Sequence, residues 1–176
     1  MTENCNERLG KKKIDLVIRE VPDFPKRGIN FKDITTLLLD QELSSEIIDT
    51  FINRLKGKKV DAIVGVESRG FLFGFLLANK MGIPFIPIRK SGKLPGETLR
   101  CKYDLEYGSE TIEIHKNSIQ QNDEVLIVDD LIATGGSASA SASLIELCKG
   151  IVSGFLFVIA QKRWFKFSFF KESFAI

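Results

Sequence analysis

Cysteine and histidine are scarce in this chain, which has three cysteines and one histidine among 176 residues. The cysteines, Cys5, Cys101 and Cys148, are widely spaced and form no CxxC or Cys/His cluster, so neither a zinc site nor a disulfide framework is predicted. His115 has no serine or cysteine partner in any motif, and we interpret it as structural, which argues against catalytic-triad hydrolysis. Unpaired cysteines are typical of a reducing compartment, so we expect a cytoplasmic protein.

Long hydrophobic runs and a large charge excess are also missing. The longest apolar runs, residues 71–78 and 155–160, are far shorter than the roughly 20 residues that a membrane-spanning helix requires. Residues 1–13 are polar and lysine-rich with no apolar segment behind them, unlike a secretory signal. The formal net charge is only +2, which predicts no broad basic surface for nucleic acid. We therefore expect a globular protein with no membrane and no nucleic-acid partner.

Apolar segments of two kinds alternate along the chain. Helical spacing is found over residues 14–21, 43–55, 70–80 and 137–149, and continuous apolar runs typical of buried strands over residues 60–66, 85–88, 125–128 and 155–160. Strands that alternate with helices predict an α/β fold with a mostly parallel central sheet flanked by helices. Ligands of such folds bind at the carboxyl ends of the strands.

The stretch between residues 89 and 115 shows neither helical spacing nor a continuous apolar run along its whole length. Residues 89–103 are rich in Gly, Pro, Lys and Arg, which predicts a long surface loop and a candidate lid. Residues 111–114 alternate apolar and polar types, as an exposed strand would. We find no internal repeat or linker, so residues 1–176 are expected to form one domain.

The segment from Val125 to Ser137 carries the clearest chemical signal, because a buried strand leads into two acids, a small-residue loop and a helix. Asp129 and Asp130 would be held at the strand end, where they can accept hydrogen bonds from ribose hydroxyls or help to hold hydrated Mg²⁺. The loop ends at a helix N-terminus, whose amides favour phosphate, and its glycines allow close approach. Neither a P-loop nor a GxGxxG pattern is present. An ordinary Asp-Asp turn before a helix is the plainer alternative.

This segment, VLIVDDLIATGGS, resembles the phosphoribosyl pyrophosphate signature of type I phosphoribosyltransferases. The segments PDFPKRGINFKDI, GVESRGFLFG and RKSGKLPGETLRCKYDLEYG are similar to adenine phosphoribosyltransferases in particular. The resemblance implies the type I fold, with an N-terminal helix and base-side hood over residues 1–34, a flexible lid loop over 89–108 and a phosphoribosyl pyrophosphate loop over 125–137. It also implies that Asp129, Asp130, Ala133, Thr134, Gly135, Gly136 and Ser137 bind the phosphoribosyl group.

The same resemblance assigns further residues to the substrates. Arg69 would bind the pyrophosphate, where a guanidinium suits bidentate contact, although it could instead be a surface arginine beside the next helix. Arg89, Lys90 and Lys93 would place positive charge over the polyanionic substrate, unless they form a solvated face. Closure of the lid would exclude water from a reactive ribosyl cation.

The remaining assignments concern the base and proton transfer. Glu106 and Tyr107 would reach the reaction centre, Glu106 as an acid/base group unless it merely ends a hairpin. The purine would stack on Phe31, with backbone groups of Asn30 and Lys32 alongside, although packing of Phe31 in the core is equally compatible with the sequence.

Purine salvage is the function that the resemblance implies: adenine and phosphoribosyl pyrophosphate give AMP and pyrophosphate. Mg²⁺ would be carried by the substrate pyrophosphate, with no direct protein ligand, and the protein would be a homodimer. Two alternatives stay open, a regulatory protein that binds phosphoribosyl pyrophosphate without turnover and an enzyme for another purine base. Residues 160–176 depart from the family pattern, since Ala160 and Gln161 stand where an acid and an apolar residue are usual.

Overall fold

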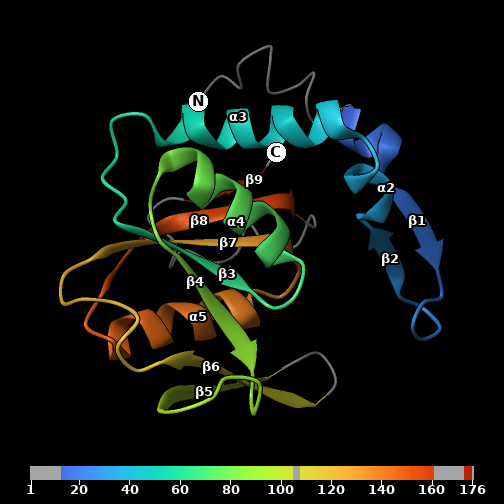
Figure 1. Ribbon diagram of the computed structural model, residues 1–176. Coiled ribbons are helices and arrows are strands. Elements are labelled where there is room, and N and C mark those ends of the chain that lie inside the picture. Colours follow the sequence, from blue (N-terminus) through green and yellow to red (C-terminus); the bar gives the residue numbers. More distant parts are fainter. Residues whose placement is uncertain (1–12, 105–107, 161–172, 176) are drawn as a thin grey trace. The chain divides into compact units, whose positions relative to one another are not determined.

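The computed structural model describes residues 13–104, 108–160 and 173–175 (Figure 1). Its contacts divide the chain into two units, one that ends at Asn53 and one from Arg54 to Ala175. None of the helices in the described ranges is both long enough and hydrophobic enough to cross a bilayer.

The first unit is built from a hairpin and helices. Residues 13–17 are helical, and β1 (Arg19–Pro22) pairs antiparallel with β2 (Asn30–Asp33). The helix predicted over residues 14–21 is therefore wrong beyond residue 17, because Val21 pairs with Phe31 in the hairpin. Pro22 supplies the reason, since a residue before proline is disfavoured in the helical region and favoured in an extended one.

Two helices follow the hairpin, α2 (Thr35–Leu38) and α3 (Gln41–Leu55). The apolar stripe that predicted a helix over residues 43–55 forms the buried face of α3, where Ile47, Ile48 and Phe51 are at most 2% exposed. The helical period thus identified this element correctly.

The second unit is a seven-stranded sheet in the order β5-β6-β4-β3-β7-β8-β9. Its strands are β3 (Ala62–Val66), β4 (Phe85–Lys90), β5 (Thr98–Asp104), β6 (Ser109–His115), β7 (Glu124–Ile132), β8 (Ile151–Ala160) and β9 (Ser173–Ala175). The pairs β4–β3, β3–β7, β7–β8 and β8–β9 are parallel, whereas β6 is antiparallel to both β4 and β5. The predicted α/β class with a mostly parallel sheet is confirmed.

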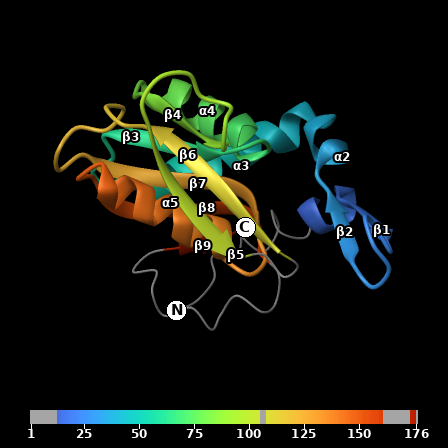
Figure 2. The ribbon, with the colours of Figure 1, turned by 90° about the horizontal axis from the view of Figure 1, so that it is seen from below.

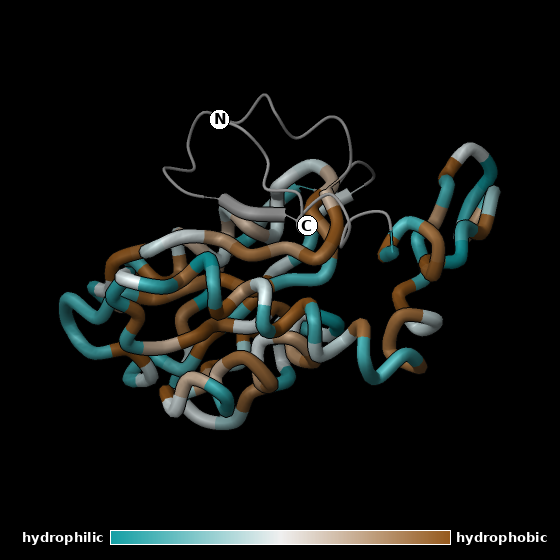
Figure 3. Tube along the Cα trace, turned by 90° about the horizontal axis from the view of Figure 1, so that it is seen from above, coloured by the Kyte–Doolittle hydropathy of each residue, from teal (hydrophilic) through white to brown (hydrophobic). Residues whose placement is uncertain are grey.

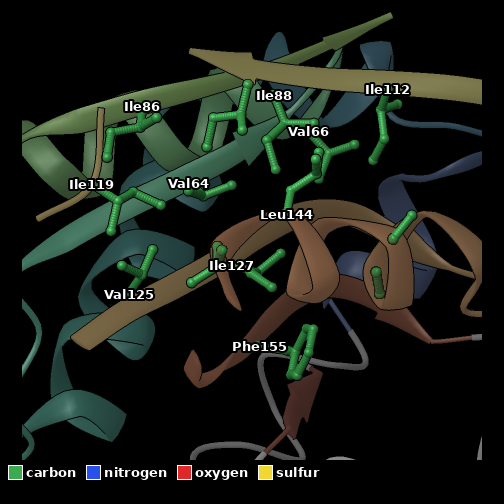
Figure 4. Close-up of a cluster of buried hydrophobic side chains, with 14 of the residues drawn as sticks. Val64, Val66, Ile86, Ile88, Ile112, Ile119, Val125, Ile127, Leu144 and Phe155 are labelled. Carbon is green, nitrogen blue, oxygen red and sulfur yellow. The ribbon is translucent and has the colours of Figure 1, made fainter. Parts of the chain in front are cut away.

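Helices cover both faces of this sheet. In Figures 1 and 2, α4 (Gly70–Met81) and α5 (Gly136–Leu147) lie on opposite sides of β3 and β7. Figure 4 shows Leu144 of α5 packed toward Val64, Val66 and Ile127 of the two central strands. The central strands β3 and β7 are buried along most of their length. In Figure 3 many of the outer bends of the trace are hydrophilic, whereas hydrophobic stretches run through its interior. Burial of this apolar surface stabilises the packing of the helices on the sheet and so fixes the positions of the strand ends.

Glycines let α4 approach the sheet closely. A Cβ at Gly74 would lie 3.5 Å from the Cα of Gly65 and 3.0 Å from the Phe85 ring. A Cβ at Gly70 would lie 2.6 Å from the Val128 carbonyl oxygen and 3.0 Å from Oδ1 of Asp129. The first turn of α4 is therefore held against the end of β7.

The region between residues 89 and 115 differs from the expectation in two ways. Residues 98–104, predicted as loop, form β5, which pairs along its whole length with β6. Residues 111–114 do form a strand, yet it is not exposed, because Glu113 is 0% exposed. Pairing with a neighbouring strand and cover from the residue 91–97 turn decide both features, and neither is encoded in local periodicity.

Candidate active site

A pocket with a volume of about 270 Å³ lies at the carboxyl ends of β3 and β7. Its walls come from Val66 at the end of β3 and residues 67–69 after it, and from residues 129–131 of β7. The other lining residues are Ala133, Thr134 and Gly135 before α5, Ser137 in α5, and Lys90, Tyr103, Glu110 and Ile112. Segments that are distant in the sequence are thus brought together where α/β folds bind ligands.

Two adjacent carboxyl groups form one wall of the pocket. The Asp130 amide donates a hydrogen bond to Oδ1 of Asp129 at 2.9 Å, and the Asp130 side chain is only 4% exposed. Burial raises the pKa of Asp129 well above its ordinary value, and the charge of Asp130 adds to this effect. Burial also raises the pKa of Asp130, although Arg69 opposes the shift. These acids are therefore costly to ionise without a further donor or cation.

Arg69 lies opposite the second acid. Its Nε is 3.0 Å from Oδ2 of Asp130, and its side chain is 37% exposed. This contact is an ion pair without hydrogen-bond alignment, because Oδ2 of Asp130 accepts no hydrogen bond from the described residues. Arg69 also lines the pocket, and a guanidinium is chemically suited to bind an anion there.

The loop before α5 forms a further part of the wall. Gly135, the residue before the helix, has φ +80°, a conformation that favours glycine, and its carbonyl accepts from the Ser139 amide at 2.9 Å. A Cβ at Gly136 would lie 2.9 Å from the Asp104 carbonyl oxygen and 3.1 Å from the Tyr103 ring, so β5 packs closely against this turn. First-turn amides of a helix have no partner within the helix and favour a phosphate.

Two carboxylates pair with the lysine and arginine at the end of β4. Lys90 Nζ lies 2.7 Å from Oε1 of Glu110, and the Tyr103 hydroxyl donates to Oε2 of Glu110 at 3.3 Å. Burial and the Glu110 charge raise the pKa of Tyr103 to about 12. Arg89 donates to both oxygens of Glu67, at 3.1 and 3.2 Å. Tyr103 therefore stays protonated, and its O–H is a donor at neutral pH.

Similarity to known proteins agrees with this geometry. Residues 36–159 match the model of the phosphoribosyl transferase domain. An adenine phosphoribosyltransferase of Clostridium botulinum is 54% identical over 142 residues, which is 81% of this chain and 83% of the relative. This chain belongs to the adenine phosphoribosyltransferase family.

Solved structures of the family have the same fold. The adenine phosphoribosyltransferase of Thermoanaerobacter pseudethanolicus superposes with a TM-score of 0.82 at 49% identity, covering 85% of this chain and 87% of that one. The Saccharomyces cerevisiae enzyme, solved in complex with adenine and an imino-altritol bisphosphate, gives 0.83 at 42% identity, covering 88% and 90%. The family resemblance and the type I fold predicted from the sequence are confirmed.

The structure brings together only some of the site residues predicted for an adenine phosphoribosyltransferase. Arg69, Lys90, the two acids and the loop residues Ala133, Thr134, Gly135 and Ser137 line one pocket, and Gly136 lies next to them. Arg89 and Lys93 do not line it: Arg89 is bound to Glu67, and its Nη1 donates to the Lys93 carbonyl at 3.2 Å. The roles of all these residues stay predictions.

The other predicted residues belong to the first unit or lie outside the described residues. Asn30, Phe31 and Lys32 belong to β2 of the first unit, where the Phe31 ring makes an edge contact with Phe24 at 5.2 Å. Glu106 and Tyr107 lie outside the described residues, as does Gln161. Their assignments therefore remain predictions from the family pattern.

Sequence reasoning missed three ionisable side chains that line the pocket, those of Glu67, Tyr103 and Glu110. Glu67 follows a predicted strand and precedes Arg69, so the strand-end rule that identified Asp129 could have found it. Tyr103 and Glu110 had no such signal, because they are neighbours only through the pairing of β5 with β6.

Proposed function

We propose that this protein transfers the 5-phosphoribosyl group from phosphoribosyl pyrophosphate to adenine, giving AMP and pyrophosphate in purine salvage. The observation that carries the proposal is one pocket that is lined by the Asp129–Asp130 pair, by the loop before α5 (residues 133–135, called the helix-start loop below) and by Arg69. Acids suit ribose hydroxyls, helix amides suit the 5-phosphate, and a guanidinium suits the pyrophosphate. The choice of adenine as the base is supported by relatives more than 50% identical that carry this name.

The reaction needs no covalent enzyme intermediate. Adenine N9 forms a bond to C1 of the ribose while the bond between C1 and the pyrophosphate oxygen breaks, and the pyrophosphate leaves with the electron pair. The N9 proton passes to a base, for which Glu106 is the candidate from the family pattern. Positive charge develops on the ribose in the transition state, so positioning and stabilisation of the leaving group carry the catalysis.

The acids of the pocket fit a magnesium ion that travels with the pyrophosphate. Mg²⁺ prefers oxygen ligands, commonly binds through one or two carboxylates plus substrate phosphates, and keeps several waters. Oδ2 of Asp130 accepts no hydrogen bond from the described residues, although Arg69 Nε lies 3.0 Å from it, and Asp129 lies beside it. These acids could accept hydrogen bonds from the waters of a hydrated Mg²⁺ without binding the ion directly. Among the described residues, no group of three or more His, Cys, Asp or Glu side chains is arranged to hold a metal. The ion would neutralise charge on the leaving pyrophosphate, and Arg69 would orient the same group.

Turnover of purine bases tests this function directly. AMP formation from adenine, phosphoribosyl pyrophosphate and Mg²⁺ is measured beside reactions with hypoxanthine and guanine, and with Arg69→Ala. We expect adenine-selective turnover, with kcat/KM lower by about 10²-fold in the variant, the loss typical of one well-aimed donor. Mg²⁺-dependent binding of phosphoribosyl pyrophosphate without turnover of any base would instead indicate a regulatory protein.

The proposal includes a homodimer in the cytoplasm. An exposed apolar stripe on α4 supports an interface, since Leu72, Phe75 and Leu76 are 41%, 57% and 48% exposed. Sedimentation or light scattering of the protein and of Phe75→Glu would test it. A monomeric wild-type protein at micromolar concentration would contradict the dimer.

A further inference from the structure

The cations at the pocket are already paired with carboxylates of the same unit. Lys90 Nζ contacts Glu110 at 2.7 Å, and Arg69 Nε contacts Asp130 at 3.0 Å. A pyrophosphate that enters must therefore compete with protein carboxylates for these positive charges. The Lys90–Glu110 pair is the more exchangeable one, because its side chains are 52% and 32% exposed, whereas Asp130 is 4% exposed.

Glu110 is held in this competing position by its own surroundings. It lies on β6 directly across from Tyr103 of β5, whose hydroxyl donates to the carboxylate oxygen that does not contact Lys90. The Lys90 backbone is also fixed, since its amide donates to Oε2 of Glu67 at 2.9 Å. The Lys90 side chain alone is therefore left to change partners, through rotation of its flexible stem.

We propose that Glu110 is a positioning residue that competes with the pyrophosphate group for Lys90 and thereby weakens the binding of pyrophosphate. This inference rests on the proposed function, because it assumes that the pocket takes phosphoribosyl pyrophosphate. Two effects act together: the carboxylate occupies the ammonium, and its own negative charge opposes a polyanion in the same 270 Å³ pocket. The consequence is easier release of the pyrophosphate product after transfer.

A double-mutant cycle tests the competition. The four proteins are wild type, Glu110→Gln, Lys90→Met and the double variant, and the probe is inorganic pyrophosphate with Mg²⁺, measured by calorimetry. Glutamine keeps the shape of the side chain and an oxygen that can accept from Tyr103, but removes the charge. Glu97→Gln is the matched control, because Glu97 pairs with Lys116 at 3.2 Å and does not line the pocket.

We expect Glu110→Gln to bind pyrophosphate about fivefold more tightly, the scale of one exposed ion pair. The gain should shrink to less than twofold in the Lys90→Met background and be absent in Glu97→Gln. In steady-state assays the KM for phosphoribosyl pyrophosphate should fall and pyrophosphate should become a stronger product inhibitor. A structural role alone would change unfolding and not this coupled difference in affinity.

Unchanged or weaker binding by Glu110→Gln would overturn the inference, as would an equal gain with and without Lys90. A folded wild-type protein that binds neither pyrophosphate nor phosphoribosyl pyrophosphate would overturn the proposed function itself and the inference with it. The two failures are thus distinguished by the wild-type titration, which is carried out first.

Discussion

Glu113 and the Asp129–Asp130 pair are acids on two strands of the same sheet, and they differ in how well hydrogen-bond donors compensate for the burial of their carboxylates. Glu113 is 0% exposed, yet it accepts from the Lys93 and Leu94 amides at 2.9 and 3.0 Å, from Arg100 at 3.0 Å and from Thr98 at 3.3 Å. Burial acts to raise its pKa, but these donors outweigh burial and hold the pKa of Glu113 below its ordinary value. This acid fastens the turn over residues 91–97 to the sheet.

The aspartates at the end of β7 show the opposite balance. Burial raises the pKa of both, and one oxygen of Asp130 accepts no hydrogen bond from the described residues. A buried carboxylate whose donors outweigh the effect of burial stabilises the fold, whereas one whose burial outweighs its donors is suited to receive a ligand. The comparison separates a structural acid from candidate functional acids without reference to any relative.

Glu113→Ala should have the largest effect on stability. Removal of a buried, hydrogen-bonded carboxylate leaves several donors without their acceptor and should lower the free energy of unfolding by about 3 kcal/mol. Urea denaturation monitored by circular dichroism measures the loss. Glu97→Ala, which removes an exposed acid from the same region, is the control and should have no measurable effect. Equal midpoints for the two variants would contradict the structural role of Glu113.

Asp130→Asn should lower activity without lowering stability, in contrast to Glu113→Ala. We expect kcat/KM for AMP formation to fall by about 10²-fold, because a contact to the ribose or its metal is lost. The free energy of unfolding should stay the same or rise, since the variant removes the cost of a buried charge that is incompletely paired. Kinetics and urea denaturation on the same preparation test both parts. A destabilised variant with intact turnover would place Asp130 with the structural acids.

The pH dependence of stability should sharpen the contrast. The pKa of Glu113 is lower in the folded state than in the unfolded state, so its carboxylate contributes to the free energy of unfolding at pH values above the unfolded-state pKa. That contribution is lost as the pH falls through the folded-state pKa. The raised pKa of Asp130 means that the folded state is favoured at low pH and loses this advantage as pH rises through the folded pKa. Melting temperatures should therefore show the deficit of Glu113→Gln shrinking toward pH 4, with any gain of Asp130→Asn largest near pH 7. Parallel curves for the two variants would contradict the assignment.

Gly136→Ala should have the smallest effect, and it acts on the functional side of the comparison. The added methyl would press on the Asp104 carbonyl and the Tyr103 ring, at a cost in stability of about 1 kcal/mol. The KM for phosphoribosyl pyrophosphate should rise a few-fold, because the helix-start loop is displaced, with little change in kcat. Steady-state kinetics at saturating adenine measures KM for phosphoribosyl pyrophosphate and kcat separately. An unchanged KM would show that the loop tolerates the displacement.

The candidate site was predictable where its residues follow one another in the sequence. The strand, the two aspartates, the small-residue loop and the helix form one continuous segment, and each part has a local signal in hydrophobic period or glycine placement. The strand-to-helix turn at Arg69 was predictable for the same reason. Glu110, Tyr103 and the burial of Glu113 were not, because each depends on which strand lies beside β6.

The amino-acid sequence by itself determined the α/β alternation, the family and the phosphate-binding segment, since periodicity, turn residues and contiguous motifs are local properties. Only the tertiary structure decided that residues 98–104 form a strand and that β1 replaces the end of the first predicted helix. It also decided that Lys90 faces Glu110. The physical reason is the same throughout: cross-strand hydrogen bonds and ion pairs join residues separated in the chain, and their free energy outweighs the local preferences on which a sequence pattern depends.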